Sequence, residues 1–140
     1  MQLKIKKLNS EAIVPHYAHP DDAGFDLFST EMREIAPMSR VQIPTGIALE
    51  IPTGYVGLVW DKSGLSHKNG LKTLGGVIDA GYRGEVKVGI INLSAETYLL
   101  EKGHKVAQMI IQKKETCEII EVDELSDTAR GEGGFGSTGK

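Results

Sequence analysis

Three aspartates lie near glycine, where a carboxylate can face a ligand. Asp79 lies within GGVIDAGYRGE (residues 75–85), which we predict to be a hairpin that holds Asp79 near its tip. The paired glycines before it let another group approach the backbone closely. Asp26, in AGFDL, and Asp61, before Lys-Ser-Gly, are the other two. The alternative for all three is structural, because Asp in a turn commonly bonds its own backbone.

The last fifteen residues, SDTARGEGGFGSTGK, have a composition that can grip a phosphorylated base. Arg130 supplies a cation, Phe135 a ring for stacking, and Ser137 and Thr138 supply hydroxyl groups among unhindered glycine N–H groups. A segment with five glycines and one large apolar side chain cannot bury enough surface to order itself. We therefore predict an arm that is mobile alone and folds over a ligand. A merely unstructured terminus is the alternative.

Histidine, cysteine and serine offer weaker candidates. His16 and His19 have the spacing to touch one metal ion, but no carboxylate or thiol completes a convincing ligand set. Cys117 lies in an expected strand, and we interpret it as a packing thiol. As a nucleophile Ser63 would need a neighbouring general base, and His67 is a poor indication of one.

Short runs rich in β-branched and aromatic residues, separated by turn signals, indicate an all-β sandwich or barrel. The segment IPTG recurs after eight residues, and we interpret the two copies as consecutive hairpin turns. The one plausible helix is short, at residues 63–68, with Ser63 as its cap. Strands are expected at residues 3–7, 41–43, 47–51, 55–60, 85–91, 106–112 and 118–122.

Length and composition indicate one folded domain. The chain has 140 residues, of which 40% are hydrophobic, which is enough for a core without metal or disulfide. Its formal net charge of -3 gives no general attraction for nucleic acid or for an anionic membrane. One cysteine excludes an internal disulfide and fits a reducing compartment. No apolar run is long enough to span a membrane or resembles a signal peptide, so we expect a cytoplasmic protein.

Five sequence blocks, taken in order, resemble the trimeric-type dUTP pyrophosphatases (dUTPases). No single block is specific, whereas the third and fifth together are. The blocks are AGFDLFS (23–29), DKSGLS (61–66), GVIDAGYRG (76–84), KGHKVAQM (102–109) and RGEGGFGSTG (130–139).

The resemblance implies a distorted jelly-roll-like β-barrel or sandwich with one short helix. It implies hydrolysis of dUTP to dUMP and pyrophosphate with Mg²⁺, which keeps uracil out of DNA and supplies dUMP for thymidylate synthesis. It also implies a homotrimer with three active sites, each built from three chains. Residues 1–125 would form the β domain, and residues 126–140 a mobile arm that closes over the active site of another subunit.

The resemblance assigns the base and sugar of the nucleotide to the third block. Asp79 would orient and deprotonate the attacking water and bond the deoxyribose 3′-hydroxyl. Tyr82 would lie under the sugar and leave no room for a 2′-hydroxyl. Backbone groups would read the edge of uracil and reject cytosine, which reverses the donor and acceptor pattern. These groups are expected around Leu74, Gly76, Val77 and Ile78.

The same resemblance assigns the triphosphate to the second, fourth and fifth blocks. Ser63 and Gly64 would bind phosphate oxygens, and Gln108 would donate its amide to phosphate or to backbone near the base. Asp26 would hold a water of the Mg²⁺ shell, while substrate phosphates mainly hold the ion. The arm residues expected to stack on uracil or to neutralise and orient the triphosphate are Arg130, Phe135, Gly136, Ser137 and Thr138.

Lys62 departs from the family pattern, which usually has arginine before Ser-Gly. Lysine keeps the charge but loses the planar two-pronged donor, so a bidentate contact becomes a point contact. We expect Lys62 to bind phosphate less firmly or to take a rearranged partner such as Asp61.

Two other functions fit the same fold. A dCTP deaminase shares the architecture and the trimer, but its catalytic glutamate aligns here with Gly89, which cannot transfer protons. A non-catalytic trimeric nucleotide-binding regulator is the second alternative. The presence of Asp79, Tyr82, Gln108 and the whole arm favours an enzyme.

Overall fold

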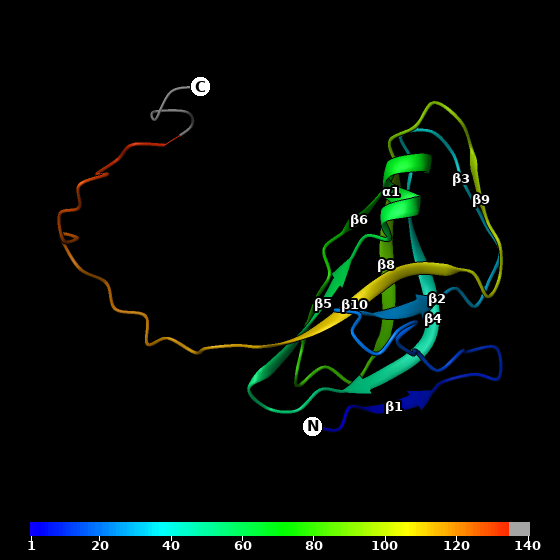
Figure 1. Ribbon diagram of the computed structural model, residues 1–140, viewed down its shortest axis with the longest axis horizontal. Helices are drawn as coiled ribbons and strands as arrows, with labels where there is room; N and C mark the ends of the chain where they lie inside the picture. Colours follow the sequence, from blue (N-terminus) through cyan, green and yellow to red (C-terminus); the bar gives the residue numbers. More distant parts are fainter. Residues whose placement is uncertain (135–140) are drawn as a thin grey trace.

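Strands dominate the computed structural model of the chain, which describes residues 1–134 (Figure 1). One antiparallel sheet has the order β1-β4-β8-β6, made of Lys4–Lys7, Arg40–Glu50, Glu85–Asn92 and Leu71–Leu74. A second has the order β2-β10-β5-β7, made of Phe25–Phe28, Lys105–Lys113, Tyr55–Trp60 and Val77–Asp79. A small sheet pairs β3 (Arg33–Ile35) with β9 (Tyr98–Leu100), and the α1 helix spans Ser63–Asn69.

The hydrophobic core gathers side chains from both four-stranded sheets. In β8 every second residue is buried, namely Val86, Val88, Ile90 and Asn92, because successive side chains of a strand point to opposite faces. Leu27 of β2 and Met109 of β10 join the same cluster from the other sheet. The described strands therefore form a sandwich and do not close into a barrel.

The predicted all-β architecture with one short helix is confirmed. The strands predicted at residues 55–60, 85–91 and 106–112 agree with β5, β8 and β10 within one residue. The helix begins at Ser63, but the prediction that Ser63 caps it is wrong, because Lys62 occupies the N-cap position and no side chain caps the helix. In the described part of the chain no helix has the length and apolar character to cross a membrane.

The structural alternative for Asp26, that it lies in a turn, is wrong, because Asp26 lies in β2. All four residues of β2 are buried, and Asp26 is one of them. Its neighbours Phe25, Leu27 and Phe28 are all buried apolar residues. Their burial outweighs the turn preference of a single aspartate.

The two IPTG segments have different structures, so the prediction of two hairpin turns is half wrong. The second copy forms the turn between β4 and β5, where the Tyr55 N–H donates to the Pro52 carbonyl at 3.1 Å. The first lies inside β4, whose pairing with β8 changes register between Pro44 and Ala48. Such a shift is a β-bulge, and Gly46 adopts a φ of 67° within it.

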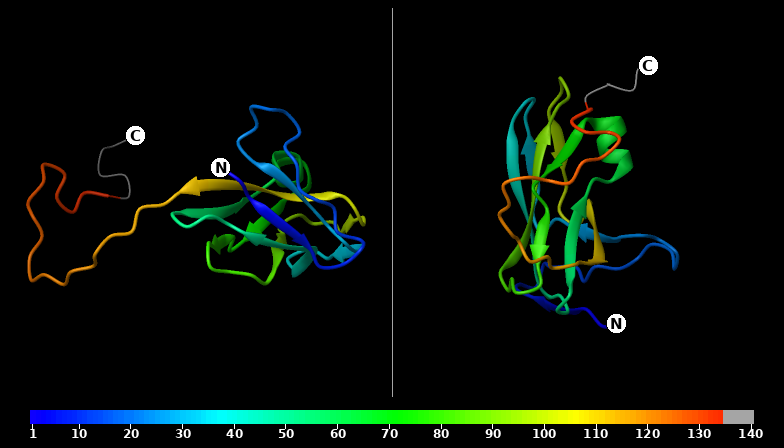
Figure 2. Two further views of the ribbon diagram at one scale, coloured as in Figure 1. Left: turned by 90° about the horizontal axis from the view of Figure 1, so that it is seen from below. Right: turned by 90° about the vertical axis from the view of Figure 1, so that its left-hand side faces the viewer.

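Residues 114–134 leave the sheets as an extended, exposed segment (Figure 1, Figure 2). The prediction of a strand at residues 118–122 is wrong, because no described strand lies beside this segment to pair with it. Its apolar side chains face solvent, with Ile119 96% and Leu125 88% exposed. The expected division into residues 1–125 and a mobile arm stays a prediction.

We predict that Gly46→Ala destabilises the fold more than Gly54→Ala. The two glycines have φ of 67° and 85°, so alanine strains either backbone by about 1–2 kcal/mol. At Gly46 the added Cβ would also meet Thr30 Cγ2 at 2.8 Å and Ala12 Cβ at 2.9 Å, whereas at Gly54 it meets nothing within 4 Å. Urea denaturation at fixed protein concentration should show a further loss of about 1–3 kcal/mol in the unfolding free energy of G46A. Equal losses of unfolding free energy in G46A and G54A would contradict the close packing around Gly46.

Candidate active site

The chain crosses from one sheet to the other at Gly75 and Gly76. β6 pairs with β8 as far as Leu74 opposite Gly89, and β7 then pairs with β5. Gly75 and Gly76 have φ of 69° and 108°. The Val59 N–H donates to the Gly76 carbonyl at 2.8 Å, and a Cβ at Gly76 would lie 2.9 Å from the Val59 carbonyl oxygen. Glycine at this point therefore permits the crossing.

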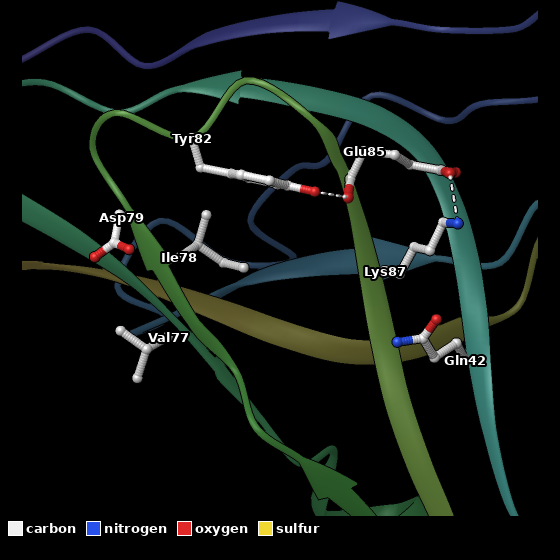
Figure 3. A pocket seen from close by; sticks show the side chains of 7 residues that line it. All are labelled: Gln42, Val77, Ile78, Asp79, Tyr82, Glu85 and Lys87. Carbon is white, nitrogen blue, oxygen red and sulfur yellow. Dashed lines mark hydrogen bonds and ion pairs between the residues drawn. The ribbon is translucent and has the colours of Figure 1, made fainter.

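The separation of β7 from β8 opens a cavity of about 480 Å³ between them (Figure 3). The two arms of the hairpin predicted at residues 75–85 therefore do not pair with each other, because β7 and β8 belong to different sheets. The volume lies within the usual range for small-molecule sites. The lining side chains come from β4, β7, β8 and the turn between the last two: Gln42, Val77, Ile78, Asp79, Tyr82, Glu85 and Lys87.

The Tyr82 ring crosses the turn and points back to the start of β8 (Figure 3). Its hydroxyl donates to the Glu85 carbonyl at 3.1 Å, and its backbone N–H donates to the Asp79 carbonyl at 3.1 Å. The Arg83 guanidinium donates to the carbonyls of Ala80 at 2.7 Å and Tyr82 at 3.0 Å. These bonds hold the turn in place. Tyr82 is 46% exposed, so the cavity is open to solvent on that side.

Asp79 ends β7 at the edge of the cavity, with its side chain exposed. Its carboxylate makes no hydrogen bond or ion pair with any of residues 1–134, although its carbonyl accepts the N–H of Tyr82. The side chain therefore does not serve the turn, contrary to the structural alternative. A carboxylate without protein partners is available to a bound water or hydroxyl group.

Asp26 lies between two lysines in a second candidate region, and its side chain is only 3% exposed. Lys62 Nζ donates to Oδ1 at 2.5 Å, and Lys105 Nζ forms an ion pair with Oδ2 at 2.6 Å without good hydrogen-bond alignment. Burial raises the pKa of Asp26, but the two ammonium groups lower it by more, so the pKa lies below its ordinary value. Of the two expectations for Lys62, the structure has the rearranged partner, but this partner is Asp26 and not the suggested Asp61.

Gln108 ties β10 to the loop before α1, since its Nε2 donates to the Asp61 carbonyl at 2.9 Å. The Asp61 carboxylate accepts hydrogen bonds from the N–H and hydroxyl of Thr73 and from Lys72, each at 2.7 Å. Burial raises the pKa of Asp61, while Lys72 and Thr73 lower it by more. This network joins the loop before α1 to β6, and both oxygens of the Asp61 carboxylate already accept hydrogen bonds from β6.

The structure gathers the predicted site residues into two groups. The cavity group, at or beside the space between β7 and β8, is Leu74, Gly76, Val77, Ile78, Asp79 and Tyr82. The lysine group, around the start of α1 and the facing strands, is Asp26, Lys62, Ser63, Gly64 and Gln108. Among residues 1–134 no hydrogen bond or ion pair joins the two groups.

Of the predicted arm residues, the structure describes Arg130, which belongs to neither group. Arg130 lies on the extended segment, where its Nε donates to the Gly133 carbonyl at 2.7 Å. The remaining arm predictions, Phe135, Gly136, Ser137 and Thr138, lie outside the described residues.

Sequence reasoning missed Lys87, Gln42 and Lys105. The alternation in the start of β8 carries a signal for Lys87, because a residue between Val86 and Val88 must point away from the core. Gln42 reaches the cavity from β4, a strand distant in sequence from β7. No local pattern indicates that Lys105 shares Asp26 with Lys62, because that contact arises from the pairing of β10 with β2.

Known proteins resemble this chain over its whole length. The dUTPase family profile matches residues 10–139. The deoxyuridine 5'-triphosphate nucleotidohydrolase of Clostridium kluyveri is 53% identical over 141 residues, with 99% of each chain covered. That of Nautilia profundicola is 51% identical over 142 residues, with 100% of each chain covered.

The chain belongs to the dUTPase family. A solved structure of the Staphylococcus bacteriophage 80alpha dUTPase with dUPNHPP has a TM-score of 0.94 and 35% identity, with 99% of each chain covered. The resemblance carried by the five sequence blocks is thus confirmed, and the all-β sandwich is the fold of a dUTPase.

Magnesium is the metal ion that the resemblance of the five sequence blocks implies for this chain. Among residues 1–134 no three or more His, Cys, Asp or Glu side chains gather to hold a metal ion. The most buried carboxylate, Asp26, already holds Lys62 and Lys105. A structure of a mutant dUTPase from phage phi11 of S. aureus, with a TM-score of 0.83 and 33% identity over 89% of this chain and 98% of that one, is described as showing a structural Mg(II) ion. Where protein carboxylates are this few, Mg²⁺ commonly takes its other ligands from waters and substrate phosphates.

We predict that Asp26→Asn lowers the unfolding free energy by about 2 kcal/mol at neutral pH, because two ammonium groups lose their buried anion. The folded-state pKa of Asp26 is depressed, so its stabilising contribution is present above the ordinary aspartate pKa of about 3.9 and is lost as pH falls through the folded value. In urea denaturation the difference between wild type and D26N should therefore shrink from about pH 6 to about pH 3. Asp21→Asn, in an exposed loop, is the matched control, and a difference independent of pH would refute the role of the charge.

Proposed function

We propose that this chain hydrolyses dUTP to dUMP and pyrophosphate. The observation that carries the proposal is its 51–53% identity with two proteins named deoxyuridine 5'-triphosphate nucleotidohydrolase over essentially the full length of both chains. In the reaction the oxygen of a water bonds to the α-phosphorus, and the bond from that phosphorus to the bridging oxygen of the β-phosphate breaks. Pyrophosphate leaves, and the proton of the water must go to a base.

Uracil and deoxyribose are assigned to the cavity between β7 and β8. Beyond Leu74 and Gly89, the edge of β8 that faces β7 has no strand partner in the described part of the chain. Its backbone N–H and C=O groups are therefore available to a planar ligand in the manner of a neighbouring strand. Such fixed groups suit the edge of uracil, and cytosine would leave donors and acceptors mismatched.

Asp79 is the proposed base. It lies at the cavity edge with no protein partner in residues 1–134, so its carboxylate can orient the attacking water, accept its proton and bond the 3′-hydroxyl. Tyr82 is proposed to lie under the sugar, since its ring lines the same cavity and is fixed by the bond to the Glu85 carbonyl. A ring held there leaves no space for the 2′-hydroxyl of a ribonucleotide.

The lysine group is proposed to bind the triphosphate. Ser63 and Gly64 begin α1 and offer backbone N–H groups to phosphate oxygens. The Gln108 amide has two N–H donors, of which Asp61 uses one. Asp26 holds Lys62 in place, and can contact a water of the magnesium shell only if a lysine gives way. When bound, magnesium neutralises charge on the phosphates.

We also propose a homotrimer whose sites are shared between subunits, with residues 126–140 closing over another subunit's site. Two features support it: no bond joins the cavity group to the lysine group within residues 1–134, and the segment after β10 exposes apolar side chains. A second chain could cover them and supply Arg130 together with the arm residues beyond it. The cytoplasm is the proposed location, since the lone Cys117 fits a reducing compartment.

The function is tested by incubating the protein with dUTP, dCTP, dTTP and UTP in the presence of Mg²⁺. We expect pyrophosphate and dUMP from dUTP alone, and loss of turnover when EDTA removes the metal. Ammonia from dCTP would instead identify a deaminase. The sequence disfavours that outcome, because the catalytic glutamate of a dCTP deaminase aligns here with Gly89, which cannot transfer protons. Binding of dUTP without any product would point to a regulator.

We predict that Asp79→Asn slows hydrolysis of dUTP by at least ~10²-fold, because asparagine cannot accept the proton of the water. Binding of a non-hydrolysable imido analogue should stay close to that of wild type, since asparagine keeps the size and one acceptor oxygen. Steady-state kinetics and calorimetry measure the two effects. Asp21→Asn serves as the control, and a D79N variant with the wild-type rate would remove Asp79 from the mechanism.

A further inference from the structure

Gly84 lies directly against the ring of Tyr82 at the end of the turn between β7 and β8. A Cβ built on Gly84 would lie 2.4 Å from the hydroxyl oxygen, 2.5 Å from Cζ and 2.9 Å from Cε2 of Tyr82. Real Cβ atoms essentially never approach another heavy atom below 3.0 Å. Any side chain at position 84 must therefore displace the ring.

The backbone itself gives no reason for glycine at this position. Gly84 is not among the described glycines with positive φ, so alanine can adopt its conformation without left-handed strain. Gly81 lies in the same turn and also lacks a positive φ, but a Cβ there would meet nothing within 4 Å. The two glycines thus form a matched pair that differs in contact with the Tyr82 ring.

The space left by Gly84 determines where that ring lies. Because Gly84 has no side chain, the Tyr82 ring can cross the turn closely enough for its hydroxyl to donate to the Glu85 carbonyl at 3.1 Å (Figure 3). A Cβ at position 84 would overlap the hydroxyl end of the Tyr82 ring, so the ring would have to move and break its hydrogen bond to the Glu85 carbonyl. Tyr82 lines the cavity, and its displacement therefore changes the shape of the cavity.

We propose that Gly84 is a positioning residue for the selection of deoxyribose over ribose. The inference rests on the proposed function, in which the Tyr82 ring occupies the space that a 2′-hydroxyl would need. Gly84 touches no ligand. By accommodating the ring it sets the gap between the ring and the sugar, and a single added methyl group alters that gap.

The test compares kcat and KM for dUTP and for UTP in wild type, G84A and G81A. In G84A we expect the ratio of kcat/KM for dUTP over UTP to fall ~10-fold or more, because specificity for a hydroxyl depends on a fixed neighbouring group. In G81A the ratio should stay within ~2-fold of wild type, as expected for a substitution without contacts. Thermal denaturation at one protein concentration checks that both variants fold.

A double-mutant cycle shows whether the effect of Gly84→Ala passes through the ring. In a Y82A background the group that Cβ would strike is gone, so adding G84A should change the selectivity ratio by less than ~2-fold. An undiminished effect of G84A in that background would overturn the proposal. Should G84A alone fail to fold, the comparison of Y82A with Y82A/G84A decides: equal ratios support the proposal, and a further loss in the double variant overturns it.

The failures of this inference and of the proposed function can be told apart. A wild-type protein that hydrolyses UTP as well as dUTP would remove the role of Tyr82 and this inference with it. A selective wild type in which G84A and G81A have equal ratios would overturn the role of Gly84 alone and leave the proposed function intact.

Discussion

The candidate site depends on one close approach of backbone to backbone, that of Gly76 to Val59. The crossing there takes β7 out of the sheet that contains β6 and β8 and pairs it with β5. If β7 instead continued alongside β8, the two strands would satisfy each other's N–H and C=O groups, and no cavity would separate them. A left-handed φ and a missing Cβ therefore determine that a binding space exists at all.

The two groups of site residues are held by different forces. In the cavity group, neutral hydrogen bonds and steric fit position the ring of Tyr82 and leave the Asp79 carboxylate free. Around the lysine group, opposite charges hold the side chains in place. The Asp26 carboxylate, which is only 3% exposed, attracts the ammonium groups of Lys62 and of the neighbouring Lys105. The division agrees with the proposed substrate, which has a planar base at one end and a strongly anionic triphosphate at the other.

Local patterns in the sequence were enough to predict the sheets' main strands but not their partners. The alternation in β8 and the β-branched and aromatic residues of β5 identify strands, because each of these patterns depends only on neighbouring residues. The bulge at Gly46 has the same local sequence as a true turn at Gly54. Contacts with residues distant in sequence distinguish the copies, such as the packing of Gly46 against Thr30 and the bond from its N–H to the Glu85 carboxylate. The partner of Lys62 likewise depends on the register of β10 against β2, which no local pattern encodes.

The sequence predicted individual chemical groups, such as the Asp79 carboxylate, better than the contacts that surround them. The exposed apolar side chains bear on the proposed sharing of sites between subunits. Val77 is 67% exposed although it lines the cavity, and the segment after β10 presents Ile119 and Leu125 to solvent. Apolar area left in water forgoes about 25 cal/mol for each Å² that could be buried. A cavity with an exposed apolar wall and a separate chain segment with exposed apolar side chains both gain from an intermolecular contact. Such a contact could also bring the lysine group of one copy towards the cavity of another, and the same burial would then complete the site and hold the copies together.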